Sequence, residues 1–488
     1  MDWWAPAESY WLARWCVQRG LGATYLVAFV VVLRQFRPLL GERGLLPVPE
    51  YLRRRSFWEA PSLFHWRYSD RLLAATAWAG VALAAAAVVG LTEAGPLWLS
   101  MACWAVLWAL YQSVVNVGQT FYAFGWESLL LEAGFLAIFL GSSDVVPPLA
   151  LIVLLRWLLF RVEFGAGLIK LRGDPCWRDL TCLRYHHETQ PLPNRWSRAF
   201  HHLPDPLHRV EVAANHVAQL VVPFGLLGPQ PIATVAGVVI IATQGWLVLS
   251  GNFAWLNVLT IVLALAAFDD AVLDAVVPVD PPTLDPSPAW HDATVALVVL
   301  LVVILSWWPV RNLLSPRQAM NRSFNPLHLV NTYGAFGSIT RVRNEVVVEG
   351  TLDAEPTARS EWRPYEFKAK PGDPRRRPRQ VAPYHLRLDW LMWFLALDRR
   401  YGEPWFVPFV VKLLEGDRAT LKLLRHDPFP DGPPQCVRAR LYRYRFSTRA
   451  ERRATGDWWV RAPVGELLPP ASLASGGEDD RRRLQVRR

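Results

Sequence analysis

Long apolar runs separated by short polar segments fill the first two thirds of the chain. A helix needs about 20 apolar residues to cross a bilayer. Runs near that length cover residues 72–91, 97–115, 129–141, 147–170, 210–227, 232–250, 253–277 and 293–309. A shorter run at 21–33 makes a ninth span if Arg34 and Arg37 extend their charged heads to the interface. It follows an amphipathic, aromatic-rich segment at 3–16 that suits the membrane surface. The pattern predicts an α-helical polytopic membrane bundle of about eight or nine spans.

Alternating apolar and polar positions replace the long apolar runs in the last third of the chain. Periods of two at 337–352, 362–368 and 438–446 predict strands. Helical spacing at 386–397 and 405–424 predicts two helices. A small soluble α+β domain is the expected fold of this region.

These patterns divide the chain into three parts. Residues 1–310 form a multipass membrane domain that contains a long polar loop at 172–209. Residues 311–462 form the soluble α+β domain. Residues 463–488 are predicted to be a disordered tail, because their low apolar content cannot build a core.

Arginine is concentrated in two polar loops, one before the second predicted span and one at 172–209. The predicted topology places both loops on one side, and cytoplasmic loops collect positive charge. The acidic loop around Asp280 and Asp285 then falls on the opposite side. Loop charge therefore favours a cytoplasmic C-terminal domain.

The net charge of +10 raises the question of a nucleic-acid partner. No helix-turn-helix, zinc-finger or RNP-like pattern accompanies it. We therefore attribute the positive charge to contact with the membrane surface and predict no nucleic-acid partner. Gly-rich phosphate loops and a GxSxG elbow are also missing from the sequence, and no cofactor is predicted. Five scattered cysteines predict no disulfide framework. The nearest pair, Cys176 and Cys182, matches neither a CxxC redox motif nor a zinc knuckle.

A stripe of charges runs through the end of the predicted span at 147–170. Arg156, Glu163 and Lys170 are seven residues apart, so they share one face of a helix. Lys170 is the only lysine before Lys368, and a lysine in an arginine-rich chain suggests an amine that can lose its proton. The alternative is a lysine at a helix end that reaches the interface. Charges inside a membrane bundle generally mark a polar site.

Four histidines in the loop at 172–209 suggest a metal, since imidazole binds zinc, copper and iron. They form the adjacent pairs His186, His187 and His201, His202. Neighbouring side chains do not converge readily on one ion, and no HxH or HxxEH pattern is present. We therefore predict hydrogen bonds to Glu188 and other groups of the loop, and no metal. Earlier in the chain, Gln119, Glu127 and Glu132 suggest a buried polar network.

Several long segments resemble the lipase maturation factor family. They are GQTFYAFGWESLLLEAGFLAIFLG, LLFRVEFGAGLIKLRGDPCWRDLTCLRYHHETQPLPN with HHLP after it, RRRPRQVAPYHLRLDWLMWFLAL and PWFVPFVVKLLEGDRATLKLL. The resemblance implies a multipass membrane protein that assists the folding of secreted lipases. Animal members reside in the endoplasmic reticulum with their C-terminal domain in the lumen. The arginine-rich, alanine-rich composition is more typical of a bacterial member, in the cell membrane.

A second, more distant resemblance concerns Lys170. Residues 165–171, followed by Trp177, are similar to the segment of vitamin K-dependent gamma-glutamyl carboxylases that carries the catalytic lysine. The carboxylase pattern has two consecutive lysines, and Ile169 takes the place of the first here. This resemblance implies that Lys170 is a base. With Glu163 on the same stripe, Lys170 and Glu163 are the candidate catalytic residues. The candidate pocket residues are Arg161, Gly167, Trp177, His186, His187, Glu188 and Gln119.

Two functions follow from these observations. The leading hypothesis is a membrane maturation factor for a secreted lipase or another client protein, embedded in the lipid bilayer. Its soluble domain would offer an aromatic surface formed by Trp390, Trp393, Phe394 and Trp405, unless these residues form the core. The alternative is a membrane enzyme that acts on a lipid or quinone-like ligand with Lys170 as base.

Overall fold

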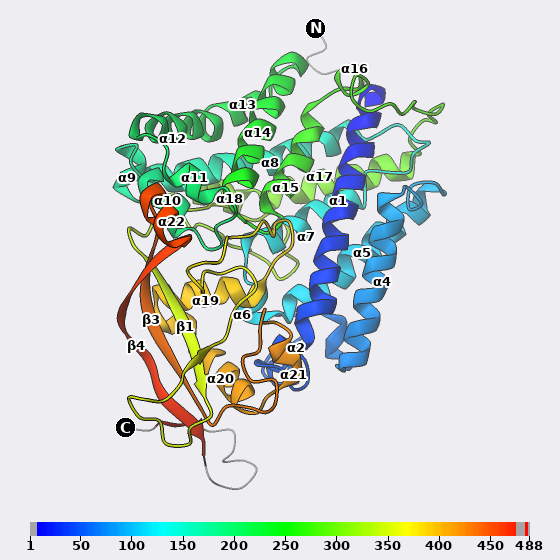
Figure 1. The fold of residues 1–488 in the computed structure, drawn as a ribbon. Helices are drawn as coiled ribbons and strands as arrows, with labels where there is room; N and C mark the ends of the chain where they lie inside the picture. The colour runs from blue at the N-terminus through cyan, green and yellow to red at the C-terminus, as the bar shows by residue number, and fades with distance from the viewer. Residues whose placement is uncertain (1–6, 475–483, 487–488) are drawn as a thin grey trace.

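The computed structural model describes residues 7–474 and 484–486, which form a helical bundle and a five-stranded sheet (Figure 1). The α-helices of the bundle are α1 (Trp11–Val31), α2 (Arg37–Leu40), α3 (Val48–Leu52), α4 (Asp70–Val88), α5 (Leu97–Asn116), α6 (Gln119–Tyr122), α7 (Gly125–Ala137), α8 (Leu149–Arg172), α9 (Pro175–Arg178), α10 (Leu183–Thr189), α11 (Ser197–His201), α12 (Asp205–Leu220), α13 (Val222–Gly225), α14 (Gln230–Ser250), α15 (Leu256–Ala264), α16 (Asp270–Leu273), α17 (Ala289–Leu305) and α18 (Trp307–Leu314). Short 3₁₀ turns lie at η1 (Ala7–Tyr10), η3 (Leu63–His65) and η4 (Leu265–Ala267), and η2 (Val32–Phe36) is a π-helical turn.

Five helices in the described part of the chain are long and apolar enough to cross a membrane. They are Ala7–Leu40, Asp70–Val88, Leu97–Asn116, Gln230–Ser250 and Ala289–Leu314. The first of them contains the apolar run at 21–33. It also contains the described part of the segment at 3–16, for which we expected a position at the membrane surface; residues 1–6 lie outside the described residues.

The count of eight or nine spans is not confirmed, and four predicted segments account for the difference. α7 and α15 have 13 and 9 residues, too few to cross about 30 Å of hydrocarbon. The run at 210–227 breaks between α12 and α13, where Pro223 lacks the N–H that would continue the helix. α8 is long enough, but Arg156, Arg161 and Glu163 give it too many charges for an apolar span.

The C-terminal domain is an antiparallel sheet with helices on one face. Its elements are β1 (Arg343–Thr351), β2 (Arg363–Pro364), α19 (Arg387–Leu397), η5 (Arg399–Tyr401), α20 (Phe406–Leu414), α21 (Arg418–Leu421), β3 (Cys436–Phe446), α22 (Arg449–Thr455), β4 (Trp459–Leu473) and β5 (Leu484–Val486). The strand order is β2-β1-β3-β4-β5. α19 packs against β1, and α20 packs against β3 and β4.

The beginning of the predicted disordered tail is ordered. Residues 463–473 extend β4 along β3, so backbone pairing with a neighbouring strand holds a segment that has too few apolar residues for a core. Residues 484–486 form β5, which pairs with the end of β4. Residues 475–483 and 487–488 of the predicted tail lie outside the described residues.

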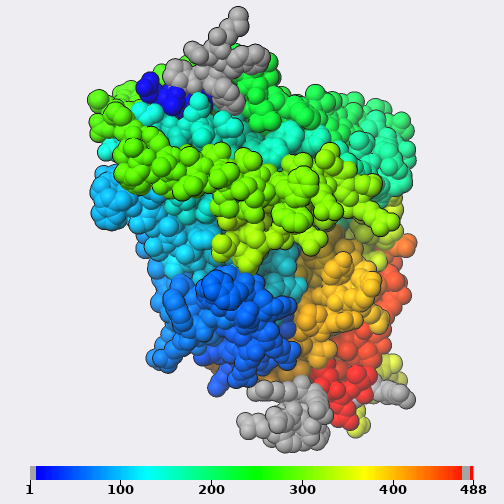
Figure 2. All heavy atoms as spheres, turned by 180° about the vertical axis from the view of Figure 1, so that it is seen from behind, coloured from blue at the N-terminus to red at the C-terminus, as the bar shows by residue number. Residues whose placement is uncertain are grey.

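The segment between α18 and β1 runs along the bundle as a tightly packed linker. At Gly165 of α8 a Cβ atom would overlap the carbonyl oxygen of Tyr333, and at Gly173 it would overlap that of Gly337. Only glycine permits so close an approach of two backbones. Figure 2 shows this yellow-green segment as it crosses the rear face between the helices and the orange and red C-terminal domain.

Candidate functional site

Lys170 lies near the end of α8 with its amine enclosed by three partners. Nζ donates hydrogen bonds to Oδ1 of Asn215 at 2.9 Å and to Oε1 of Gln219 at 2.8 Å. It also lies 5.0 Å from the centroid of the Trp177 ring, within cation–π range. Two oxygen acceptors and one aromatic face match the three donors of an ammonium group. The surroundings therefore fit a charged lysine that is held in place.

Glu163, one of the two predicted catalytic residues, is joined to Lys170 through an amide. Gln219 donates from Nε2 to Oε2 of Glu163 at 3.2 Å while its Oε1 accepts from Lys170. Gln244 donates to the other carboxylate oxygen at 2.6 Å, and Asn257 donates to Gln244 at 2.6 Å. We call this chain of Lys170, Gln219, Glu163, Gln244 and Asn257 the polar relay. It connects α8, α12, α14 and α15 inside the bundle.

Gly167 brings α12 close enough for this contact. A Cβ atom at this position would lie 2.8 Å from Cδ2 of Leu220 and 3.0 Å from Cβ of Gln219. A larger residue would push α12 away from α8 and separate Gln219 from its two partners. Gly167 thus contributes to the site by its small size.

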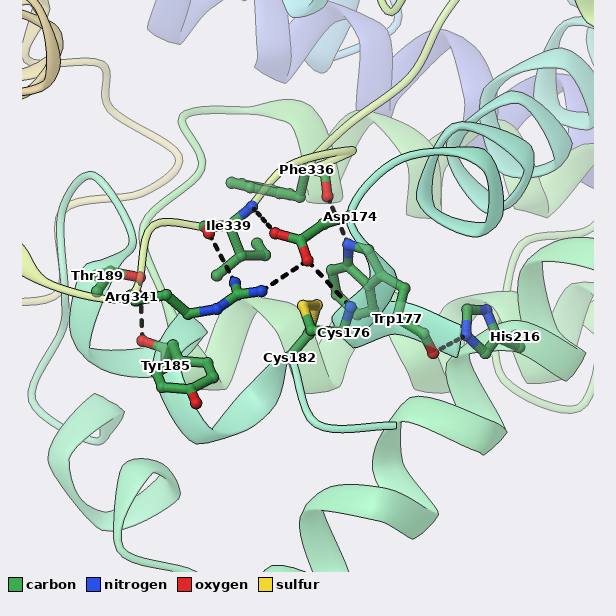
Figure 3. Close-up of a disulfide and its surroundings, with 10 residues drawn as sticks. All are labelled: Asp174, Cys176, Trp177, Cys182, Tyr185, Thr189, His216, Phe336, Ile339 and Arg341. Carbon is green, nitrogen blue, oxygen red and sulfur yellow. Dashed lines mark hydrogen bonds and ion pairs between the residues drawn. A yellow bond between two sulfur atoms is a disulfide. The ribbon is translucent and has the colours of Figure 1, made fainter. Parts of the chain in front are cut away.

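Trp177, whose ring faces Lys170, lies in the loop that a disulfide closes at residues 176–182, here called the disulfide loop (Figure 3). A disulfide joins Cys176 to Cys182, a pair for which the cysteine pattern predicted no bond. Trp177 donates from Nε1 to the carbonyl oxygen of Phe336 at 2.8 Å, and its own carbonyl accepts from His216 at 2.9 Å. The loop therefore fixes the ring that faces Lys170.

Asp174 fixes the start of this loop. Its carboxylate caps α9 by accepting from the backbone N–H of Cys176 at 3.0 Å. It also accepts a hydrogen bond from Arg341 at 2.6 Å, and that bond lowers the pKa of Asp174 below its ordinary value. The loop at 172–209 is thus tied to the linker that leads into the C-terminal domain.

The other loop residues of the predicted pocket have different partners. The ring of His186 stacks edge-on against Phe336 at a centroid distance of 4.8 Å. Glu188 accepts from the backbone N–H of Phe446 at 2.7 Å, and burial raises its pKa. His187 turns toward α12, where it faces Glu211. Glu188 is therefore a contact between the loop and the sheet.

Two predicted pocket residues lie in other networks. Gln119 donates to the carbonyl oxygen of Leu46 at 3.0 Å. Arg161 forms a buried ion pair with Glu132 and donates to the carbonyl oxygen of Asn331 at 2.7 Å. Both side chains connect parts of the fold, and neither takes part in the polar relay.

Little in the sequence points to the partners of Lys170. Asn215 and Gln219 are four residues apart and share a face of α12, but the apolar pattern of residues 210–227 predicts a membrane span there. Gln244 and Asn257 are single polar residues in apolar helices, which is a usable signal for a buried contact. The proposed aromatic surface on the C-terminal domain is largely internal, because Trp390 and Trp405 are buried.

Comparisons with known proteins cover nearly the whole chain. Residues 12–275 match the lipase maturation factor transmembrane domain, and residues 329–469 match the lipase maturation factor C-terminal domain. Lipase maturation factor 1 of Bos taurus is 43% identical over 96% of this chain and 90% of its own length. The Homo sapiens protein of that name is 43% identical over 95% of this chain and 88% of its own.

A second group of relatives is less similar. Lipase maturation factor 2 of Homo sapiens is 29% identical over 95% of this chain and 83% of its own length. No solved structure matches the chain.

Proposed function

The chain belongs to the lipase maturation factor family, and we propose that it is a membrane maturation factor whose disulfide loop and C-terminal domain meet a secreted lipase in an oxidising compartment. Its role is to assist the folding of the lipase or of another secreted client. The disulfide between Cys176 and Cys182 is the observation that carries this placement. Disulfides persist in oxidising compartments and are rare in the cytosol.

The order of the candidate spans supports a position of the loop at 172–209 and the C-terminal domain on the same side of the membrane. Two candidate spans, Gln230–Ser250 and Ala289–Leu314, separate the loop at 172–209 from the sheet. An even number of crossings returns the chain to the side it left. Glu188 of the loop and Phe446 of β3 are in direct contact, which requires that arrangement.

This placement differs from the cytoplasmic side that loop charge favours. Several arginines of the loop take part in folded contacts: Arg184 pairs with Asp205, and Arg198 donates to the carbonyl oxygen of Ser447 at 2.8 Å. The rule of positive cytoplasmic loops is counted on short segments and weakens for long loops and domains. We therefore give the disulfide more weight than the arginine count.

The matched relatives named above are animal proteins, and they support the maturation role rather than the carboxylase alternative. A bacterial origin stays a prediction from composition. Within the maturation role, we assign Lys170 to positioning: its charge holds α12 and Trp177 together beside the disulfide loop. No step at a lipid or quinone-like ligand is needed for this role.

The direct test is the activity of a secreted lipase. A cell line without its own maturation factors secretes the lipase with or without this chain, and lipase activity is divided by lipase mass in the medium. We expect the chain to raise this specific activity several-fold. Equal specific activity in both cultures, with the chain present in the membrane fraction, would exclude the proposed function.

A further inference from the structure

Three side chains that could bind a metal converge where α10 meets α12, two helical turns before Gln219 of the polar relay. His187 comes from α10, and His208 and Glu211 come from α12. One donor atom from each residue lies within 4.8 Å of the other two. His208 and Glu211 are three residues apart, so they share one face of α12. The cluster therefore joins the loop at 172–209 to the helix that carries Gln219.

The donor atoms are buried and have no hydrogen-bond partner among the described residues. They are both ring nitrogens of His187, Nδ1 of His208 and Oε2 of Glu211. Nε2 of His187 lies 3.7 Å from Oε1 of Glu211, which is too long for a hydrogen bond. Because His187 is only 2% exposed, bulk water does not solvate its ring. Buried polar atoms without a partner destabilise the fold, and a bound ion would satisfy the ones gathered here.

Neighbouring groups already hold the second ring nitrogen of His208 and the second carboxylate oxygen of Glu211. Nε2 of His208 lies 3.3 Å from the carbonyl oxygen of His201. If Nε2 carries the proton and donates it there, Nδ1 has a lone pair free for a metal ion. Trp246 donates to Oε1 of Glu211 at 2.7 Å and leaves Oε2 available. Metal-binding histidines commonly donate their second N–H to a carbonyl oxygen in this way.

We propose that His187, His208 and Glu211 bind a transition-metal ion of the zinc class. Two imidazoles and one carboxylate are a ligand set that suits Zn²⁺. Three protein ligands leave one position of a tetrahedral ion to water. Donors within 4.8 Å of one another need only small side-chain movements to reach bonds of about 2 Å.

The bound ion connects α10 to α12, the helix that also carries Gln219 of the polar relay. Asn215 and Gln219, the partners of Lys170, follow Glu211 on α12 by one and two helical turns. The site does not depend on the proposed client. A second group of possible ligands, Asp174 with Cys176 and Cys182, is excluded as long as the disulfide keeps both sulfurs from the ion.

The test measures Zn²⁺ binding to the purified full chain in detergent without reductant. After chelator treatment, Zn²⁺ is titrated against a coloured competitor, and bound metal is counted by mass spectrometry. We expect about one ion per chain. Glu211→Gln keeps an acceptor for Trp246 and His208→Asn keeps a polar side chain, so both variants should fold yet bind Zn²⁺ at least about tenfold more weakly. His202→Gln changes a neighbouring histidine outside the cluster and serves as the control.

Thermal unfolding gives a second readout. Zn²⁺ should raise the Tm of the wild-type chain and of His202→Gln, because binding to the folded state stabilises it. At the same zinc concentration it should raise the Tm of Glu211→Gln by clearly less. Wild-type protein without stoichiometric zinc, or Glu211→Gln and His208→Asn variants that bind zinc as tightly as wild type, would overturn the proposal.

Discussion

Arg387 of α19 forms an ion pair with Glu127 of α7 at 2.8 Å, and both side chains are completely buried between the C-terminal domain and the bundle. The guanidinium also donates to the carbonyl oxygen of Phe121 at 2.7 Å and lies 3.3 Å from the centroid of the Tyr122 ring. Its backbone N–H donates to Gln35 at 3.0 Å. One residue of the C-terminal domain therefore contacts three parts of the helical bundle.

Removing one partner of this pair should be strongly destabilising. Arg387→Leu leaves Glu127 charged in a buried interface, and breaking a buried pair costs about 3–5 kcal/mol. We expect a clear fall in Tm and in the amount of folded protein in the membrane. Arg445→Ala is the matched control, because Arg445 and Glu451 form a pair on the surface. Similar Tm values for the two variants would contradict a special role for Arg387.

Lys170 variants can separate a positioning role from a base role. Lys170→Met leaves the oxygens of Asn215 and Gln219 without their donor, at a cost of about 1–3 kcal/mol. Lys170→Arg keeps a positive charge and N–H donors, so it should retain more client maturation than Lys170→Met. The measurement is the specific activity of the secreted lipase, normalised to folded chain. Loss of all activity in a well-folded Lys170→Arg variant would instead favour a neutral amine.

Acid should destabilise the chain through His385. Burial, with help from the positive charge of Arg387, lowers the pKa of His385 to about 4. Between its ordinary pKa of about 6.5 and pH 4, the unfolded chain binds a proton that the folded chain does not. This contribution to stability is complete above pH 6.5 and is lost as the pH falls, by up to about 3 kcal/mol.

The measurement for His385 is Tm as a function of pH from 8 to about 4.5. His385→Gln should show a smaller fall in Tm than wild type over the acidic half of this range. His426→Gln, a change at an exposed histidine, should follow the wild-type curve. Parallel curves for wild type and His385→Gln would show that this residue does not control the acid response.

Cysteine labelling tests the side of the membrane on which the C-terminal domain lies. A cysteine that replaces Gly432 has open space around it. A cysteine that replaces the exposed Leu91 lies in the loop before the candidate span Leu97–Asn116. That span separates Leu91 from the disulfide region, so the two should lie on opposite sides of the membrane. In a background without Cys16, Cys103 and Cys436, an impermeant maleimide is added to sealed microsomes. We expect labelling at position 91 at once and at position 432 only after detergent. The reverse pattern would place the C-terminal domain in the cytoplasm.

The helical bundle with candidate spans and the small C-terminal domain with a sheet were predictable from the sequence, and Lys170 does lie beside Trp177. Its error in the number of spans has a physical cause: apolar composition marks burial in protein as well as burial in lipid. α7 and α15 are apolar because other helices cover them. Hydropathy alone does not distinguish these two surroundings.

The partners within the site were harder to predict. Gln219 meets Lys170 only because α12 crosses α8 at Gly167, and a crossing point depends on the whole fold. The sequence pairs His187 with His186, its neighbour in the chain, whereas in the fold His187 also faces His208 and Glu211. The i, i+3 spacing of His208 and Glu211 was the local signal that could have indicated this cluster.

The close backbone contacts at Gly165 and Gly173 leave the linker no freedom to act as a flexible tether. Together with the Arg387–Glu127 pair, they fasten the C-terminal domain to the bundle. A client bound to that domain would stay at a constant height above the lipid headgroups. The protein would then act as a static platform for a folding client, without movement of the C-terminal domain relative to the bundle.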